Sequence, residues 1–304
     1  MTVDPFLSVS ISVTYSGKEP VLRDLSLEMQ RGEILGLAGG SGSGKSTLAL
    51  AVMNLLGRDC FISGHVYFNG HELLAMTASE LRNIHGRELA LILQSPAAAL
   101  NPMLRIGTQL REAWKAHERT QEGEMAILEA LEAVSLPTNR SFLRSYPNQI
   151  STGQGQRVLI AMAILHRPLL IIADEPTSAL DAITQMEILQ LLNQCNRKWR
   201  TAILLISHDL AALESVCQRV AVLHDGHIVE CAPVSEILRN PNHSFTQRLT
   251  QSLRRGTAPE RLEDAIRCPH PALGGLDEPA KPTVYEGTGE ILERDGQACA
   301  DDSE

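Results

Sequence analysis

The chain has 304 residues, of which 43% are hydrophobic and 4% aromatic, and its formal net charge is −9. This length allows about two domains or one large α/β domain, and the acidic balance gives no general argument for nucleic-acid binding. The charge is uneven, because residues 256–304 hold twelve acidic and four basic side chains, which leaves about −1 for residues 1–255. The sequence therefore predicts a body of mixed charge and an acidic tail.

No apolar run approaches the roughly 18 residues of a membrane span, and the first residues lack the basic segment and apolar core of a signal peptide. We therefore expect the chain to remain in the cytosol. Its six cysteines lie far apart without a C-x-x-C spacing, which predicts free thiols.

Apolar and polar residues alternate over residues 7–15 and again over 25–29, which predicts two antiparallel strands near the N-terminus. Tyr15 ends the first of these strands. Its ring could stack on a purine base or pack against the sheet, and the periodicity favours neither reading.

A glycine-rich loop, Gly39 to Thr47, fits the pattern G-x-x-x-x-G-K-[ST]. It follows a predicted buried strand, residues 33–38, and opens a predicted helix, residues 46–56. Its glycines let backbone N–H groups converge on phosphate, and the helix N-terminus adds positive charge. Lys45 would reach the β- and γ-phosphates, and the Ser46 hydroxyl would bind Mg²⁺. We predict a nucleotide site built from Gly39, Gly40, Ser41, Gly42, Ser43, Gly44, Lys45, Ser46 and Thr47.

The middle of the chain changes from strand to helix patterns. Asn69-Gly70 between apolar residues predicts a hairpin, and residues 89–93 predict a strand that runs into Gln94. Residues 95–102 are rich in proline and small residues, which indicates a loop. The pattern is then helical, so about residues 95–166 are predicted to form a helical subdomain inserted between strands of the core.

Two continuous apolar runs, residues 169–173 and 202–206, have the pattern of strands buried on both faces of a parallel sheet. Asp174 follows the first run, and His208 follows the second. In such sheets ligands lie beyond the carboxyl ends of the strands. Because Lys45 also lies after a strand, we expect Lys45, Asp174 and His208 to share one site.

The C-terminal third is predicted to contain a helix over residues 184–200, a hairpin around Asp225-Gly226 and an amphipathic helical stretch over residues 235–253. Beyond it, prolines, glycines and acidic residues leave too little apolar surface to offset the entropy of ordering. The predicted domains are therefore residues 1–250, a nucleotide-binding domain, and residues 251–304, an acidic and mostly disordered tail.

Four polar residues at the strand ends supply the chemistry of phosphoryl transfer. Asp174 can hold Mg²⁺ indirectly or through water, as a Walker-B carboxylate does, and Glu175 can polarise the attacking water. Gln94 could contact both metal and water, and His208 could donate to the γ-phosphate. Alone, the acidic pair could be a helix cap, Gln94 a surface amide and His208 a structural residue. Their joint placement favours a Mg²⁺-dependent ATPase, and the lack of an arginine finger predicts that a second chain completes the site.

Taken in order, these motifs resemble the ATP-binding cassette of ABC transporters over about residues 6–250. The resemblance implies a P-loop NTPase core of the RecA-like type, with an N-terminal antiparallel β subdomain and an inserted helical subdomain. The matching segments are Gly39–Thr47, Gln94, Ile150-Ser-Thr-Gly-Gln154, residues 170–177, Ser178-Ala-Leu-Asp181 and His208.

The resemblance also implies a head-to-tail dimer, with ATP held between the phosphate loop of one cassette and the signature segment, residues 150–154, of the other. It implies that Tyr15 stacks on adenine, that Asp181 communicates between the two sites, and that the Gln94 loop couples to membrane subunits. The signature residues that would bind the nucleotide are Ser151, Gly153 and Gln154.

Residues 94–102 and 240–246 are similar to the dipeptide, oligopeptide and nickel importer branch of that family. This implies the ATPase subunit of a bacterial importer of peptides, nickel or a similar solute, held at the cytoplasmic face of the inner membrane. Its partners would be two permeases, an extracytoplasmic binding protein and a second cassette, identical or not. The alternative is a soluble ABC ATPase of translation or DNA repair, but such relatives usually carry two cassettes or long insertions. A non-hydrolysing sensor is disfavoured because Asp174 and Glu175 are both present.

The sequence departs from this branch at two places. Thr152 stands where the signature usually has its first glycine, so a β-branched side chain lies where a backbone should approach phosphate. We expect the site built with this signature to hydrolyse ATP less well than its mate in a mixed dimer. The C-terminal cysteine cluster of many members is reduced to Cys268 and Cys299, so we expect no iron–sulfur centre.

Overall fold

The computed structural model describes residues 5–118 and 122–255. The chain divides into two units, Met1–Ile266 and Arg267–Glu304, and all described residues belong to the first. Most of the predicted tail therefore lies outside the described residues, as do Cys268, Cys299 and the expectation about an iron–sulfur centre. Within the described ranges the cysteines are free, as predicted, at Cys60, Cys195, Cys217 and Cys231.

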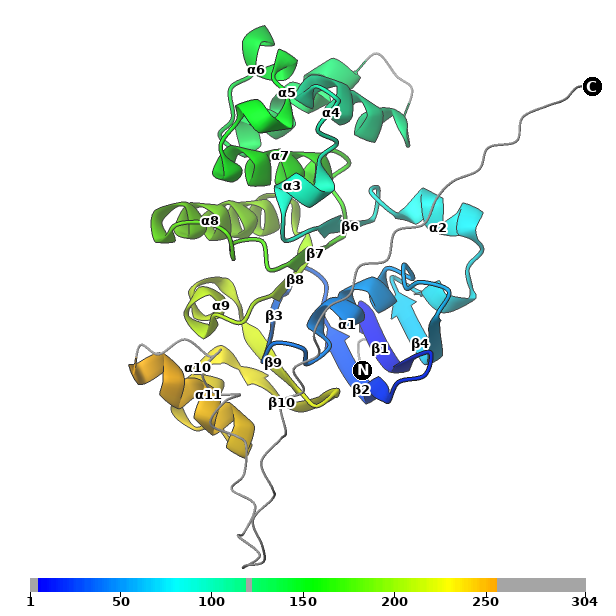
Figure 1. The fold of residues 1–304 in the computed structure, drawn as a ribbon, viewed down its shortest axis with the longest axis vertical. Coiled ribbons are helices and arrows are strands. Elements are labelled where there is room, and N and C mark those ends of the chain that lie inside the picture. The colour runs from blue at the N-terminus through cyan, green and yellow to red at the C-terminus, as the bar shows by residue number, and fades with distance from the viewer. Residues whose placement is uncertain (1–4, 119–121, 256–304) are drawn as a thin grey trace, which may run out of the picture. The chain divides into compact units, whose positions relative to one another are not determined.

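A four-stranded sheet forms the N-terminal subdomain, with the order β2-β1-β4-β5 (Figure 1). Its strands pair antiparallel, as predicted for the first two. The hairpin at Asn69-Gly70 is also confirmed, and both turn residues have positive φ, 49° and 85°, as a two-residue hairpin turn requires. The strands are β1 (Leu7–Tyr15), β2 (Pro20–Met29), β4 (Cys60–Phe68) and β5 (His71–Glu72).

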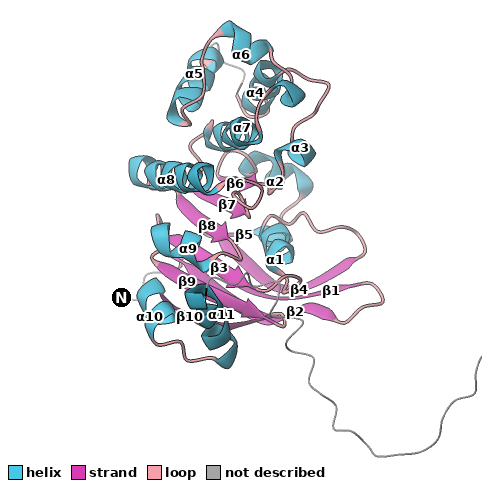
Figure 2. Cartoon of the chain, turned by 60° about the vertical axis from the view of Figure 1, so that its left-hand side comes forward, coloured by secondary structure: helices cyan, strands magenta, loops and turns pink. Residues whose placement is uncertain are grey.

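A six-stranded sheet forms the core, with the order β10-β9-β3-β8-β7-β6 (Figure 2, where the strands of both sheets are magenta). The strands from β9 to β6 are parallel, as predicted, and β10 is antiparallel to β9. Asp174, the last residue of β7, pairs with Ile206, the last residue of β8, so the two strands end at the same edge. The strands are β3 (Ile34–Gly39), β6 (Leu89–Ile92), β7 (Leu170–Asp174), β8 (Ala202–Ile206), β9 (Arg219–His224) and β10 (His227–Pro233).

Hydrophobic clusters cover both faces of the core sheet. Alternate residues of β7 belong to different clusters. Ile171 packs with residues of two helices, one that follows the signature segment and one that precedes β8. Ile172 packs with residues of the N-terminal sheet and of the helix after β3. This burial on both faces explains the continuous apolar run that predicted the strand. It also holds the strand ends rigidly, which is what a site at the sheet edge needs.

Helix α1 (Lys45–Val52) follows the phosphate loop, and it ends four residues earlier than predicted. Asn54 takes a positive φ of 49°, and Leu55 is 50% exposed. The prediction counted Leu55 and Leu56 as helical because they are apolar, although the chain has already turned away.

Between β7 and β8 lies α8 (Ala182–Trp199), which confirms the predicted helix and ends at Arg200 in a left-handed conformation typical of helix ends. Three short elements were not predicted, because elements this short leave little periodicity in the sequence. They are the 3₁₀ turn η1 (Leu73–Ala75), α2 (Ala78–Ile84) and α9 (Leu210–Val216).

The inserted segment is helical, as predicted, and forms the upper, green part of Figure 1. The expectation of a plain loop over residues 95–102 is wrong, because α3 (Pro96–Ala99) forms one turn there. Proline is favourable at the first position of a helix, and the three alanines that follow are strong helix formers. The other elements are α4 (Ile106–Lys115), α5 (Gly123–Ala133), α6 (Arg140–Arg144), the 3₁₀ turn η2 (Pro147–Gln149) and α7 (Thr152–Ile164).

The hairpin at Asp225-Gly226 is confirmed by β9 and β10, but the single helical stretch predicted after it is wrong. Two helices form instead, α10 (Val234–Arg239) and α11 (Ser244–Arg255). The break falls at Asn240-Pro241, because proline disfavours a helical conformation in the residue before it. Since α11 continues to Arg255, the first five residues of the predicted tail are helical.

Candidate active site

The phosphate loop joins the end of β3 to the start of α1, as its sequence predicted. Gly44 precedes the helix with φ 104°, and a Cβ atom there would lie 2.6 Å from Leu22 Cδ2. A Cβ atom at Gly39 would lie 2.5 Å from the carbonyl oxygen of Leu223. Both glycines of the motif are thus required by this packing, and the loop passes tightly over the strand ends.

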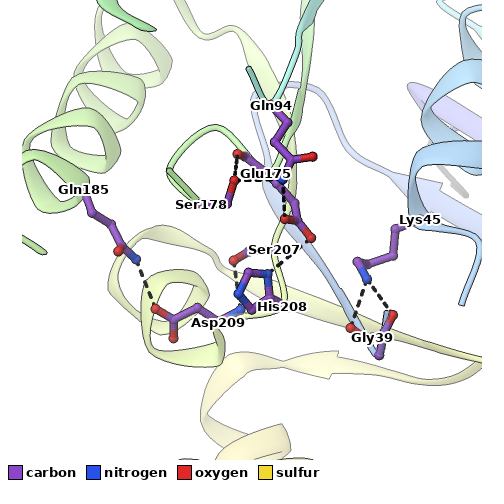
Figure 3. A network of polar contacts seen from close by, with 10 residues as sticks. Gly39, Lys45, Gln94, Glu175, Ser178, Gln185, Ser207, His208 and Asp209 are labelled. Atoms are coloured by element: carbon purple, nitrogen blue, oxygen red, sulfur yellow. Dashed lines mark hydrogen bonds and ion pairs between the residues drawn. The ribbon is translucent and has the colours of Figure 1, made fainter. Parts of the chain in front are cut away.

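Lys45 lies inside this loop and is only 7% exposed. Its Nζ donates to the carbonyl oxygens of Gly39 at 3.0 Å and Gly40 at 2.7 Å (Figure 3). The Ser43 hydroxyl, in the same loop, is buried and has no hydrogen-bond partner. The loop therefore presents an ammonium group, a hydroxyl and a helix N-terminus, a set of donors that suits phosphate oxygens.

Asp174 at the end of β7 supplies the metal side of the site. One oxygen, Oδ1, is buried without a hydrogen-bond partner, and the Ser46 side chain lies close enough to lower the pKa of the carboxyl group. Burial raises its pKa above the ordinary value, the charge of Glu175 adds to this, and Ser46 and Lys45 oppose it. A buried carboxylate oxygen without a proton donor, beside a hydroxyl, fits a hard cation such as Mg²⁺.

Glu175, the next residue, joins two more of the predicted site residues. Its Oε2 lies 3.3 Å from Gln94 Nε2, and its Oε1 lies 3.3 Å from His208 Nδ1 (Figure 3). The backbone of Glu175 has a positive φ of 46°, and its N–H donates to the carbonyl oxygen of Ile206 at 3.0 Å. The structure therefore brings Gln94, Glu175 and His208 together at the ends of β6, β7 and β8.

Ser178 belongs to this network, although its sequence pattern predicts no role for it. Its hydroxyl accepts a hydrogen bond from Gln94 Nε2 at 3.0 Å and donates to the backbone oxygen of Glu175 at 3.2 Å. Its place after Asp174-Glu175, in the matching segment Ser178-Ala-Leu-Asp181, does not indicate a partner 84 residues away. Ser178 therefore helps to hold Gln94 against Glu175.

The signature residues lie elsewhere, at the start of α7 in the helical subdomain. Ser151 Oγ accepts from the N–H of Gln154 at 3.2 Å, and Gln154 Oε1 accepts from the N–H of Ser151 at 3.1 Å, a capping box. Gly153 is half-buried, and Thr152 is exposed. The capped helix presents its positive N-terminal end, and binding of a nucleotide there stays a prediction.

Two further predicted residues also lie outside the network around Glu175. Asp181 caps α8: its Oδ1 accepts from the N–H groups of Ile183 and Thr184 at 3.1 and 3.0 Å. The Thr184 side chain, and then its backbone, hold the pKa of Asp181 below its ordinary value. Tyr15 ends β1, half-buried and opposite Cys60. Communication by Asp181 and adenine stacking by Tyr15 stay predictions.

Comparison with known proteins shows the family to which this chain belongs. The family model described as ABC transporter matches residues 22–178. The oligopeptide transport ATP-binding protein OppD of Lactococcus lactis subsp. cremoris is 40% identical over 248 residues, 80% of this chain and 73% of its own. The dipeptide transport ATP-binding protein DppD of Haemophilus influenzae is 40% identical over 232 residues, 75% of this chain and 70% of its own.

The fold is likewise similar to a solved structure, a dimeric post-hydrolysis state of the ATP-binding cassette MJ0796 bound to ADP and Pi. The TM-score is 0.66 at 27% identity, and the match covers 75% of this chain and 98% of that one. This confirms the predicted P-loop NTPase fold class. The chain therefore belongs to the ABC transporter family and is an ATP-hydrolysing cassette of its dipeptide and oligopeptide branch.

Proposed function

We propose that this chain is the Mg²⁺-dependent ATPase subunit of a bacterial importer and that it drives the uptake of peptides. The observation that carries the proposal is the arrangement of Glu175 between Gln94 and His208, at the sheet edge that also holds Asp174. The names of the relatives, which are oligopeptide and dipeptide transport proteins, support the peptide cargo.

In this proposal each site residue has a distinct task. Lys45 and the loop amides bind the β- and γ-phosphates, while Asp174 and Ser46 would hold Mg²⁺, which would neutralise phosphate charge when bound. Glu175 accepts a proton from the attacking water, and Gln94 orients that water.

His208 supports the reaction from the other side of Glu175. Its ring lies against the Glu175 carboxylate and donates to the γ-phosphate oxygen. Positioning and charge neutralisation, rather than covalent chemistry, lower the barrier.

The proposed assembly is a head-to-tail pair of cassettes bound to two permeases. An extracytoplasmic binding protein delivers the solute to these permeases. Ser151, Gly153 and Gln154 would close over the nucleotide held by the other cassette, Asp181 would lie between the two sites, and Tyr15 would stack on adenine. None of the helices among the described residues is long and apolar enough to cross a membrane. In this proposal the permeases hold the chain at the cytoplasmic face of the membrane.

The test is Glu175→Gln in the full chain. The variant keeps the shape of the side chain but loses the base, so phosphate release should fall by about 100-fold or more while ATP binding persists. Glu214→Gln, which changes an exposed carboxylate on α9, is the matched control and should behave as wild type. Wild-type turnover in Glu175→Gln would contradict the assignment of the base.

A second experiment separates the importer from a soluble ABC ATPase. The tagged chain is purified from detergent-solubilised membranes of its own host. Co-purification of multi-span permeases supports the importer, and recovery of the chain without them in the soluble fraction favours the alternative.

A further inference from the structure

The first turn of α8 reaches the loop that carries His208. Gln185 Nε2, in this turn, donates a hydrogen bond of 3.0 Å to Asp209 Oδ2. Figure 3 shows the Gln185 side chain extending from α8 toward Asp209, beside His208. The bond spans 24 residues of sequence and joins two segments that follow different strands.

Asp209 holds its own loop with its remaining polar groups. Its Oδ1 accepts from the N–H of Ala211 at 2.9 Å and so caps α9, while its backbone N–H donates to Ser207 Oγ at 3.0 Å. Its other oxygen, Oδ2, takes the bond from Gln185. The position of residues 207–209, and with it that of the His208 ring, is thus tied to α8.

The same turn of α8 is fixed on its other side. Thr184 Oγ1 donates to Asp181 Oδ2 at 2.7 Å, within the cap of the helix. The Thr184 methyl group packs against the signature segment, since a Cβ atom at Gly153 would lie 2.9 Å from Thr184 Cγ2. One helical turn therefore contacts the signature segment through Thr184 and the His208 loop through Gln185.

We infer that Gln185 is a positioning residue for ATP hydrolysis, acting through Asp209 on His208. Gln185 itself touches no reacting group. The inference rests on the proposed function, because in a head-to-tail dimer the signature segment meets the nucleotide of the other cassette. In that dimer, the first turn of α8 contacts the His208 loop at one nucleotide and the signature segment at the other. It therefore couples the position of His208 to that of the signature segment.

The first experiment removes the bond and keeps the volume. Gln185→Met is compared with Gln190→Met, which changes an exposed glutamine farther along α8, both in the full chain within its assembled complex. We expect kcat of Gln185→Met to fall about tenfold, because a misplaced His208 weakens transition-state contacts. The KM for ATP should stay within about twofold, since Lys45 and the phosphate loop are unchanged. An unaltered kcat overturns the inference.

The second experiment reverses the polarity of the bond. Gln185→Glu places a carboxylate against Asp209, and Asp209→Asn removes the acceptor charge while an asparagine oxygen can still cap α9. Each single variant should be slower than wild type. The double variant restores one amide and one carboxylate, so its kcat should recover to within about threefold of wild type.

Recovery in the double variant supports the inference, because a merely destabilised loop would not regain activity from a second change. A double variant no faster than the slower single variant overturns it. Wild type and Glu175→Gln are measured alongside. If wild type shows no turnover, or Glu175→Gln retains it, the proposed function fails. If wild type turns over ATP and Glu175→Gln does not, a failure of the Gln185 variants to behave as expected contradicts only the role of Gln185.

Discussion

Glu175 and His208 lie 3.3 Å apart, from Oε1 to Nδ1, although 33 residues separate them in the chain. The contact follows from the parallel pairing of β7 with β8, in which Asp174 lies opposite Ile206. The N–H of Glu175 donates to the carbonyl oxygen of Ile206, and its positive φ turns the chain at that point. A left-handed conformation of a residue other than glycine costs on the order of 1 kcal/mol or more, and the hydrogen bond to β8 maintains it at Glu175.

Replacement of Asp174 by asparagine should weaken metal binding and stabilise the metal-free protein. Burial is the main cause of the raised pKa of Asp174, so the ionised carboxylate costs stability at every pH above its pKa in the unfolded chain. Asp174→Asn should raise the melting temperature of metal-free protein at neutral pH and weaken Mg²⁺ binding tenfold or more, by about 1.4 kcal/mol or more. Titration of Mg²⁺-dependent nucleotide binding and calorimetric melting measure the two effects. Asp59→Asn, at an exposed position, is the control and should change neither.

Wild-type Mg²⁺ affinity should also depend on pH in a defined direction. A proton competes with the metal for the Asp174 carboxylate, and because its pKa is raised, the competition begins at a higher pH than for an ordinary aspartate. Affinity should therefore weaken as the pH is lowered from neutral, and Asp174→Asn should lose that dependence. A wild-type affinity that is flat down to the ordinary aspartate range would contradict this account.

The two central glycines of the phosphate loop should differ in their tolerance of alanine. At Gly44, φ is 104° and a Cβ atom would lie 2.6 Å from Leu22 Cδ2, whereas at Gly42, φ is 74° and nothing lies within 4 Å. Gly42→Ala bears only the backbone cost of about 1 kcal/mol, and Gly44→Ala adds a clash, for a total of about 2–4 kcal/mol. Chemical denaturation measures both values. Equal losses would show that the contact with Leu22 relaxes freely.

Local patterns predicted much of this fold because the relevant burial is visible in the sequence. The apolar run of β7 reflects packing on both faces, and the parallel pattern of the two runs predicts that β7 and β8 end at the same edge, as they do at Asp174 and Ile206. The hairpin at Asn69-Gly70 was predicted because few other residue pairs accept two positive φ angles. Where one interaction dominates the local conformation, the sequence is sufficient.

Tertiary contacts account for what the sequence did not predict. The bond between Gln185 and Asp209 joins two ordinary polar residues at no characteristic spacing, and nothing in the sequence signals it. The left-handed backbone of Glu175 is imposed by β8, since a glutamate has no local preference for it. Asn240-Pro241 shows the opposite failure: the proline was present in the sequence, but amphipathic periodicity on both sides concealed the break.

The side chain of Thr152 should lower the activity of the nucleotide site that its helix completes. It is the exposed first residue of α7, next to the capping box of Ser151 and Gln154. Thr152→Gly should raise ATP turnover of the assembled transporter severalfold, because the backbone can then approach phosphate. Glycine costs a helix up to about 1 kcal/mol, so a gain cannot come from a more stable helix. Thr152→Ala, which removes the hydroxyl and methyl groups but keeps the Cβ atom, should be intermediate, and unchanged turnover in both variants would remove the idea.

Glu230 on β10 should stabilise the start of α11 in a pH-dependent way. Its Oε1 accepts from the N–H of Asn242 at 2.9 Å, and its Oε2 accepts from the N–H of His243 at 3.1 Å. Burial acts to raise the pKa of Glu230, but these hydrogen bonds outweigh it, so the net pKa is lowered from the ordinary value of 4.5. The sign follows from linkage: a lowered pKa gives stability above the unfolded value, and that stability is lost as the pH falls through the folded one.

Glu230→Gln should therefore lower the free energy of unfolding at neutral pH by about 1 kcal/mol, a modest value because the carboxylate is partly exposed to solvent. The difference from wild type should shrink as the pH falls below the ordinary glutamate range, where the wild-type carboxylate is itself protonated. Denaturant unfolding at a series of pH values measures it, and Glu236→Gln, at an exposed position on α10, is the control. If the difference stays constant across that range, the charge of Glu230 is not what holds the two backbone N–H groups, and neutral hydrogen bonds are sufficient.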